Sequence, residues 1–193
     1  MALFTRLYDA CIRWSRHRFA ARYLAGLSFA ESSFFPIPPD VMLMPMSLAQ
    51  PQRAMYFAAL TTLASVLGGM AGYAIGHFAL EWIAPLIETG GRWAHSYEKA
   101  SQWFEQWGFW AVLIAGFSPI PYKVFTISAG ALSMTFIPFV LASAVGRGAR
   151  FFLVAGLLSW GGAEMEARVR RYVEAIGWSL VGLGVAAYLA VKL

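Results

Sequence analysis

The apolar residues of this chain gather in long blocks separated by short charged stretches. Residues 54–80 carry no formal charge, and a helix of that length crosses a hydrocarbon core of about 30 Å. Residues 175–191 form another charge-free block. A shorter apolar block at about 147–163 can span only if its arginines snorkel or face a cavity. The pattern therefore predicts spanning helices over these three ranges.

Two further apolar blocks are interrupted by proline. The first covers about 23–49 and the second about 108–145. Proline breaks the helix ladder, and non-helical backbone persists at membrane depth only where protein or a wet cavity covers it. We therefore predict two facing re-entrant helical hairpins. Their tips are Pro36, Pro38 and Pro39 in the first hairpin, and Pro119 and Pro121 in the second.

The two tips share a short pattern, Phe35-Pro-Ile-Pro38 in one and Ser118-Pro-Ile-Pro121 in the other. Such an internal echo is typical of the inverted repeats of transporters. Within residues 54–80, Gly68, Gly72 and Gly76 are spaced so that a second helix can approach closely, within the chain or in a homo-oligomer.

The ends of the chain flank this core, which we expect to cover 23–165. Residues 1–22 carry five arginines opposite an apolar stripe, which predicts a basic amphipathic helix on anionic headgroups; a solvated basic tail is the alternative. Residues 166–193 comprise a charged connection and the last predicted span.

Composition supports an all-α polytopic membrane protein. Apolar residues make up 59% of the chain and charged residues 13%, against about 45–50% and about 25% in soluble domains. The net charge of the chain is +5, and in a membrane protein such a basic surplus usually lies at the cytoplasmic face, where it sets the orientation. We therefore expect no nucleic-acid partner. One cysteine and three scattered histidines predict no metal site and no cofactor. No nucleophile elbow, phosphate-binding loop or phosphatase set is present, so no enzyme is expected.

Ionisable residues inside the apolar blocks are the candidate site. Each costs about 2.5–3.5 kcal/mol on insertion scales, and such residues usually mark function. We expect Lys123, Arg147 and Arg150 to hold an anionic lipid phosphate, because guanidinium groups make forked contacts with phosphate. Glu31 and Asp40 are the candidate proton-coupling carboxylates. Either acid is also expected to pair with Lys123 where the tips meet, or alternatively to cap a helix end.

Two stretches carry a resemblance to a known family. Glu31-Ser-Ser-Phe-Phe-Pro-Ile-Pro-Pro-Asp40 resembles the first signature of the DedA family of membrane proteins, also called the VTT or SNARE-associated domain family. The stretch from Gly116 through Ser118-Pro-Ile-Pro121 and Lys123 to Gly130 resembles the second signature. The resemblance covers roughly 25–165 and is closest to the short, YqaA-like branch.

The resemblance implies two facing re-entrant hairpins and the transport of lipid carriers, among them undecaprenyl phosphate, with proton-motive-force dependence in some members. The essential acids of the family match Glu31 and Asp40. Its second signature has one arginine between the glycine and the phenylalanine, and another after the proline. Here Gly116 directly precedes Phe117, and Lys123 stands about one position from the second arginine.

We therefore expect a multi-pass protein of a bacterial inner membrane. It would act as a flippase that moves a phosphate-bearing lipid between leaflets, with membrane lipids as its partners. A small ion or proton/cation exchanger is the first alternative. A non-catalytic envelope-assembly factor is the second, and it would leave the cost of the intramembrane charges unexplained.

Overall fold

A computed structural model describes residues 17–88, 92–118 and 121–161, and these residues contain helices and no strand. The all-α prediction is confirmed for this part of the chain. Most of the predicted N-terminal helix, and the predicted C-terminal span, lie outside the described residues. In chain order the helices are α2 (Ala20–Ser33), α3 (Asp40–Ala49), the short 3-10 helix η1 (Pro51–Arg53), α4 (Ala54–Glu88), α5 (Arg92–Phe117), α6 (Tyr122–Ala131) and an unlabelled helix, Phe136–Gly161.

Two of the described stretches are long and apolar enough to cross a membrane. They are Pro51–Leu80, which includes most of α4, and Phe136–Gly161. The first contains the predicted span 54–80. The second begins at Phe136, so the predicted start near residue 147 is wrong. Ser133, with a left-handed φ of 53°, lies in the turn after α6, and the next helix then runs through Arg147 and Arg150 without a break.

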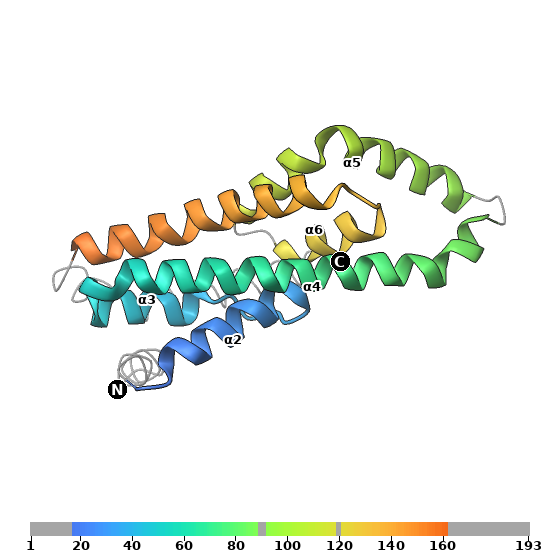
Figure 1. Ribbon diagram of the computed structural model, residues 1–193. Coiled ribbons are helices and arrows are strands. Elements are labelled where there is room, and N and C mark those ends of the chain that lie inside the picture. The colour runs from blue at the N-terminus through green and yellow to red at the C-terminus, as the bar shows by residue number, and fades with distance from the viewer. Residues whose placement is uncertain (1–16, 89–91, 119–120, 162–193) are drawn as a thin grey trace, which may run out of the picture.

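The described chain repeats one layout. A helix is followed by a break, by a return helix of 10 residues and then by a long apolar helix. The first half is α2, α3 and α4, and the second half is α5, α6 and Phe136–Gly161. Each element of the second half runs opposite to its counterpart along the long axis of the molecule (Figure 1). Both proline-containing segments thus have the helix–break–helix form that was predicted, whereas their entry into a membrane stays a prediction.

Glycine lets three helices meet backbone to backbone. A Cβ added at Gly68 would collide with the carbonyl oxygen of Phe29 in α2. One added at Gly76 would collide with the carbonyl oxygen of Ile127 in α6, and one at Gly130 with that of Tyr73. Only residues without a side chain permit this approach. The close packing predicted for the α4 glycines is therefore confirmed within the chain.

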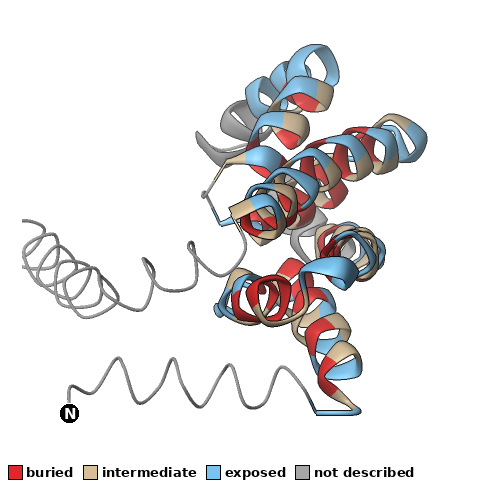
Figure 2. Ribbon diagram, turned by 90° about the vertical axis from the view of Figure 1, so that its left-hand side faces the viewer, coloured by how far each residue is buried: buried red, intermediate tan, exposed pale blue. Residues whose placement is uncertain are grey.

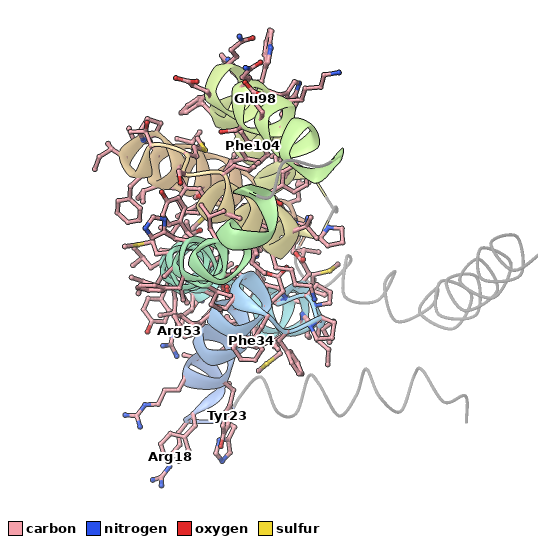
Figure 3. All side chains as sticks on the ribbon, turned by 90° about the vertical axis from the view of Figure 1, so that its right-hand side faces the viewer. Arg18, Tyr23, Phe34, Arg53, Glu98 and Phe104 are labelled. Carbon is pink, nitrogen blue, oxygen red and sulfur yellow. The ribbon has the colours of Figure 1, made fainter. Side chains whose placement is uncertain are left out.

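Buried residues lie on the faces that the helices turn toward one another (Figure 2). One apolar cluster joins α2, α3 and α4 to Phe151 and Ala155, and the other surrounds Tyr122 and Phe139. The outer faces carry large exposed apolar side chains such as Leu63 and Leu157, as expected of helices surrounded by lipid. Arg18 and Tyr23, near the start of α2, lie at the opposite edge of the molecule from Glu98 of α5 (Figure 3).

Candidate functional site

A charged cavity of about 310 Å³ lies between the two breaks. Its lining residues come from both halves: Glu31, Phe35, Pro36, Pro38, Pro39, Asp40, Pro121, Lys123, Arg147 and Arg150. Arg147 lies close to the middle of its apolar helix, and its hydrogen-bond partner Ser65 lies close to the middle of Pro51–Leu80. The cavity therefore lies about midway along the two apolar stretches Pro51–Leu80 and Phe136–Gly161.

Arg147 is the most deeply enclosed charge of the cavity, with 3% of its side chain exposed. It forms an ion pair with Glu31, and its Nε donates to Ser65 Oγ at 2.6 Å. The guanidinium carbon lies 4.8 Å from the ring centroid of Tyr122 and 4.7 Å from that of Phe151. Arg147 is thus held by a carboxylate, two hydroxyl groups (those of Ser65 and Ser32) and two aromatic rings.

A row of buried hydroxyl groups between α2 and α4 places Glu31 in this network. Ser28 Oγ donates to the Thr61 carbonyl oxygen at 2.8 Å, and Ser32 Oγ lies 2.7 Å from Ser65 Oγ. The residues of the second contact lie one helical turn after those of the first in both helices, so the two contacts together fix the register of α2 on α4. Ser32 Oγ also donates to Glu31 Oε2 at 3.1 Å, which orients the carboxylate.

Arg150 connects the two breaks. Its Nη2 donates to Asp40 Oδ2 at 2.7 Å, and its Nη1 donates to the Ser118 carbonyl oxygen at 2.6 Å. Asp40 is the first residue of α3, and Ser118 follows the last residue of α5. Arg147 and Arg150 are three residues apart on one helix, so both reach the same side of it. One helix of the second half therefore holds both acids of the first half.

Lys123 lines the same cavity but has no ion pair or side-chain hydrogen bond with any described residue. The expected pairing of Lys123 with Asp40 or Glu31 is wrong, because Arg150 and Arg147 take those acids. The two carboxylates and three cations among the described lining residues sum to a formal charge of +1. The cavity thus has one cation in excess and space beside it.

Helix capping does not account for the acids. The N-cap residue of α3 makes no side-chain hydrogen bond to the helix, and the Asp40 carboxylate contacts Arg150 instead. Glu31 lies inside α2 and contacts Arg147. Both carboxylates therefore face the cavity cations.

All but one of the site residues predicted from the sequence line this cavity. The exception is Pro119, which lies outside the described residues; Pro121 of the same tip lines the cavity. Sequence reasoning missed Ser32, Ser65 and Tyr122. The sequence does contain a signal for the two serines. Hydroxyl side chains recur four residues apart in two apolar helices, at Ser28 and Ser32 and at Thr61 and Ser65, and such pairs can hydrogen-bond from one helix to another.

The sequence model of the VTT domain family matches residues 35–159 of the chain. This range includes every described cavity-lining residue except Glu31. A protein of Haemophilus influenzae named only as uncharacterized is 52% identical over the whole length of both chains. A homologous protein of Histophilus somni is 47% identical, also over the whole length of both.

A more distant relative carries a functional name. Undecaprenyl phosphate transporter A of Staphylococcus aureus is 27% identical over 68% of each chain. No solved structure matches the chain.

Proposed function

The chain belongs to the VTT domain family, the DedA family of the sequence resemblance, and on that basis we propose that it is a membrane transporter for a phosphate-bearing lipid. The lipid would be undecaprenyl phosphate or a phospholipid-like molecule, moved between the leaflets of a bacterial inner membrane. Its headgroup would enter the cavity between the two breaks while its chains stay in the bilayer.

The observation that carries the proposal is the excess cation of the cavity. Lys123 faces the cavity without a counter-ion among the described residues, and Arg150 lies beside the same space. A phosphate group supplies the missing negative charge and accepts charge-assisted hydrogen bonds from lysine and arginine. The name of the Staphylococcus aureus relative supports the same class of substrate.

Proton coupling is the second part of the proposal. Among the described residues, Glu31 and Asp40 are the only acids that line the cavity, with 12% and 16% of their side chains exposed. Protonation of either acid would raise the positive charge facing the headgroup. Loss of that proton on the other side of the membrane would favour release.

The test is reconstitution of the full chain in liposomes with a fluorescent polyprenyl phosphate. We expect the wild type to move the lipid between leaflets, and Lys123→Ala and Asp40→Asn to slow the movement at least tenfold. Lys99→Ala and Glu98→Gln are matched controls, because both residues are exposed on α5, outside the cavity. Equal rates for the wild type and both cavity variants would contradict the mechanism.

The same liposomes test the two alternatives. An ion or proton/cation exchanger would carry current without any lipid phosphate. An envelope-assembly factor would move neither ions nor lipid, and Asp40→Asn would still complement a deletion strain. The proposed transporter predicts lipid movement and loss of complementation.

A further inference from the structure

The two ion pairs of the cavity differ in how firmly they are held. In the Glu31–Arg147 pair the side chains are 12% and 3% exposed, and in the Asp40–Arg150 pair they are 16% and 19% exposed. The exposed fraction of the Arg147 side chain is about one sixth of that of Arg150. This difference separates a pair that is built into the protein from one that a ligand can reach.

The Glu31–Arg147 pair is surrounded by further contacts. Besides the carboxylate, Arg147 contacts Ser65 Oγ and Ser32 Oγ, the latter at 3.2 Å from Nη2. The rings of Tyr122 and Phe151 pack against its guanidinium group. A ligand that took Arg147 from Glu31 would therefore have to reach a guanidinium group that is 3% exposed and is also held by two serine hydroxyl groups and two aromatic rings.

The Asp40–Arg150 pair is more open. Apart from Asp40, the only described partner of the Arg150 side chain is the Ser118 carbonyl oxygen, which is uncharged. The unpaired Lys123 lines the same cavity. A ligand at this place meets one lysine and an arginine whose only counter-charge is a single carboxylate.

From this contrast we propose that the phosphate group takes the place of Asp40 on Arg150 and binds Lys123 as its second cation. The inference rests on the proposed function and names its headgroup subsite. Asp40 accepts only from Nη2 of Arg150, and a phosphate oxygen can accept the same charge-assisted hydrogen bond in its place. Arg147 is then a positioning residue, which keeps α2 against the second half and does not contact the headgroup.

This assignment makes Asp40 a built-in competitor of the ligand. Neutralising Asp40 frees Arg150, so the affinity for phosphate rises even though transport falls. If all five charges held the ligand jointly, Asp40→Asn would disturb the site and lower its affinity for phosphate. The sign of the change in affinity distinguishes the two.

The experiment measures binding to the full chain in detergent micelles by calorimetry. The probes are dodecyl phosphate, a single-chain lipid phosphate, and inorganic phosphate. We expect Asp40→Asn to bind dodecyl phosphate at least fivefold more tightly than the wild type, and Lys123→Ala and Arg150→Gln to bind it at least tenfold more weakly. In the double variant Asp40→Asn/Arg150→Gln the gain should disappear, because the two residues act through one contact. Glu98→Gln, on the surface of α5, should leave the affinity unchanged.

Weaker or unchanged binding by Asp40→Asn, or no binding of either probe by the wild type, overturns the inference. Near-UV circular dichroism of each variant shows whether it has folded. Should Arg150→Gln fail to fold, Lys123→Ala and Asp40→Asn still give opposite expected signs. The proposed function fails separately. If Asp40→Asn tightens binding of inorganic phosphate alone, or if reconstituted wild type moves no lipid, the subsite stands but its phosphate does not come from a lipid.

Discussion

The two halves of the molecule share a layout and differ in charge. Each half has a return helix of 10 residues, and in each the long helix begins five residues after the return helix ends. Of the described lining residues, the first half supplies both acids and the second half supplies all three cations. Both ion pairs therefore join one half to the other.

The same contrast appears at single positions. Asp40 follows Pro-Ile-Pro-Pro at the first break, and Lys123 follows Pro-Ile-Pro-Tyr at the second. Ser65 and Arg147 each lie eleven residues after the start of their helices, Ala54 and Phe136, and they are hydrogen-bonded to each other. Related positions thus meet at the centre with different chemistry. A repeated backbone can build the cavity, while the charge of the cavity depends on the differences between the repeats.

The largest effect is expected where the halves meet at Arg147. Arg147→Ala leaves Glu31 enclosed without its cation, which costs about 3–5 kcal/mol. We expect a large fall in the thermal unfolding midpoint in detergent and loss of lipid movement. The double variant Glu31→Met/Arg147→Met removes both charges at similar volume and should recover most of the stability without recovering transport. Equal unfolding midpoints for Arg147→Ala and the wild type would show that the pair does not hold the halves together.

The next effect tests the contact of α4 with α6. Gly130→Ala and Gly76→Ala each bring a Cβ into a backbone carbonyl group, so the helices must separate at a cost of about 1–3 kcal/mol. Gly26→Ala is the matched control, because no heavy atom lies within 4 Å of its added Cβ. This substitution in α2 should stabilise the protein by about 0.4–1 kcal/mol. Unfolding midpoints that fall equally for all three variants would contradict the packing.

A smaller effect is expected when the chemistry of the second break is changed at Lys123. Lys123→Ala should weaken binding of a lipid phosphate about tenfold, which corresponds to about 1.4 kcal/mol. Lys123→Arg keeps the charge and adds a forked donor, so binding should be retained or strengthened. Calorimetry with dodecyl phosphate measures both. Weaker binding by Lys123→Arg than by Lys123→Ala would show that charge is not what position 123 supplies.

The smallest effects are expected at two buried serines. Ser65→Ala removes hydrogen bonds to Arg147 and Ser32 and should cost about 1 kcal/mol, the usual net contribution of an intramolecular hydrogen bond. Ser47 is also fully buried, yet its Oγ has no hydrogen-bond partner among the described residues. Ser47→Ala should therefore leave the unfolding midpoint unchanged or raise it slightly. A clear fall for Ser47→Ala would reveal a partner of that hydroxyl.

Much of this arrangement could be predicted from local chemistry. Proline marks both breaks, the charge-free block 54–80 marks a long helix, and the rare charges of the apolar blocks mark the cavity. Each of these signals is a property of a residue in its own segment. They depend on the backbone geometry of proline and on the cost of burying charge.

The partners of those charges could not be predicted in the same way. Which cation meets Glu31 depends on how α2 lies on α4, and that register is set by contacts such as Ser32 with Ser65. From sequence alone, an arginine inside an apolar run indicates the end of a span. Arg147 nevertheless lies within a span, because it pairs with Glu31, and Glu31 lies more than a hundred residues away along the chain. Long-range pairing of this kind leaves no periodic signal in the chain.

The length of the return helices has an electrical consequence. A helix of 10 residues rises about 15 Å, half of a hydrocarbon core of about 30 Å. On the proposed function, a headgroup between the tips of two such helices sits halfway across the transmembrane voltage. Each elementary charge then gains or loses about 1 kcal/mol per 100 mV on each half of its journey, since the full crossing is worth about 2.3 kcal/mol. Entry and exit of an anion would therefore respond to voltage to similar extents, and neither step would carry the whole electrical work.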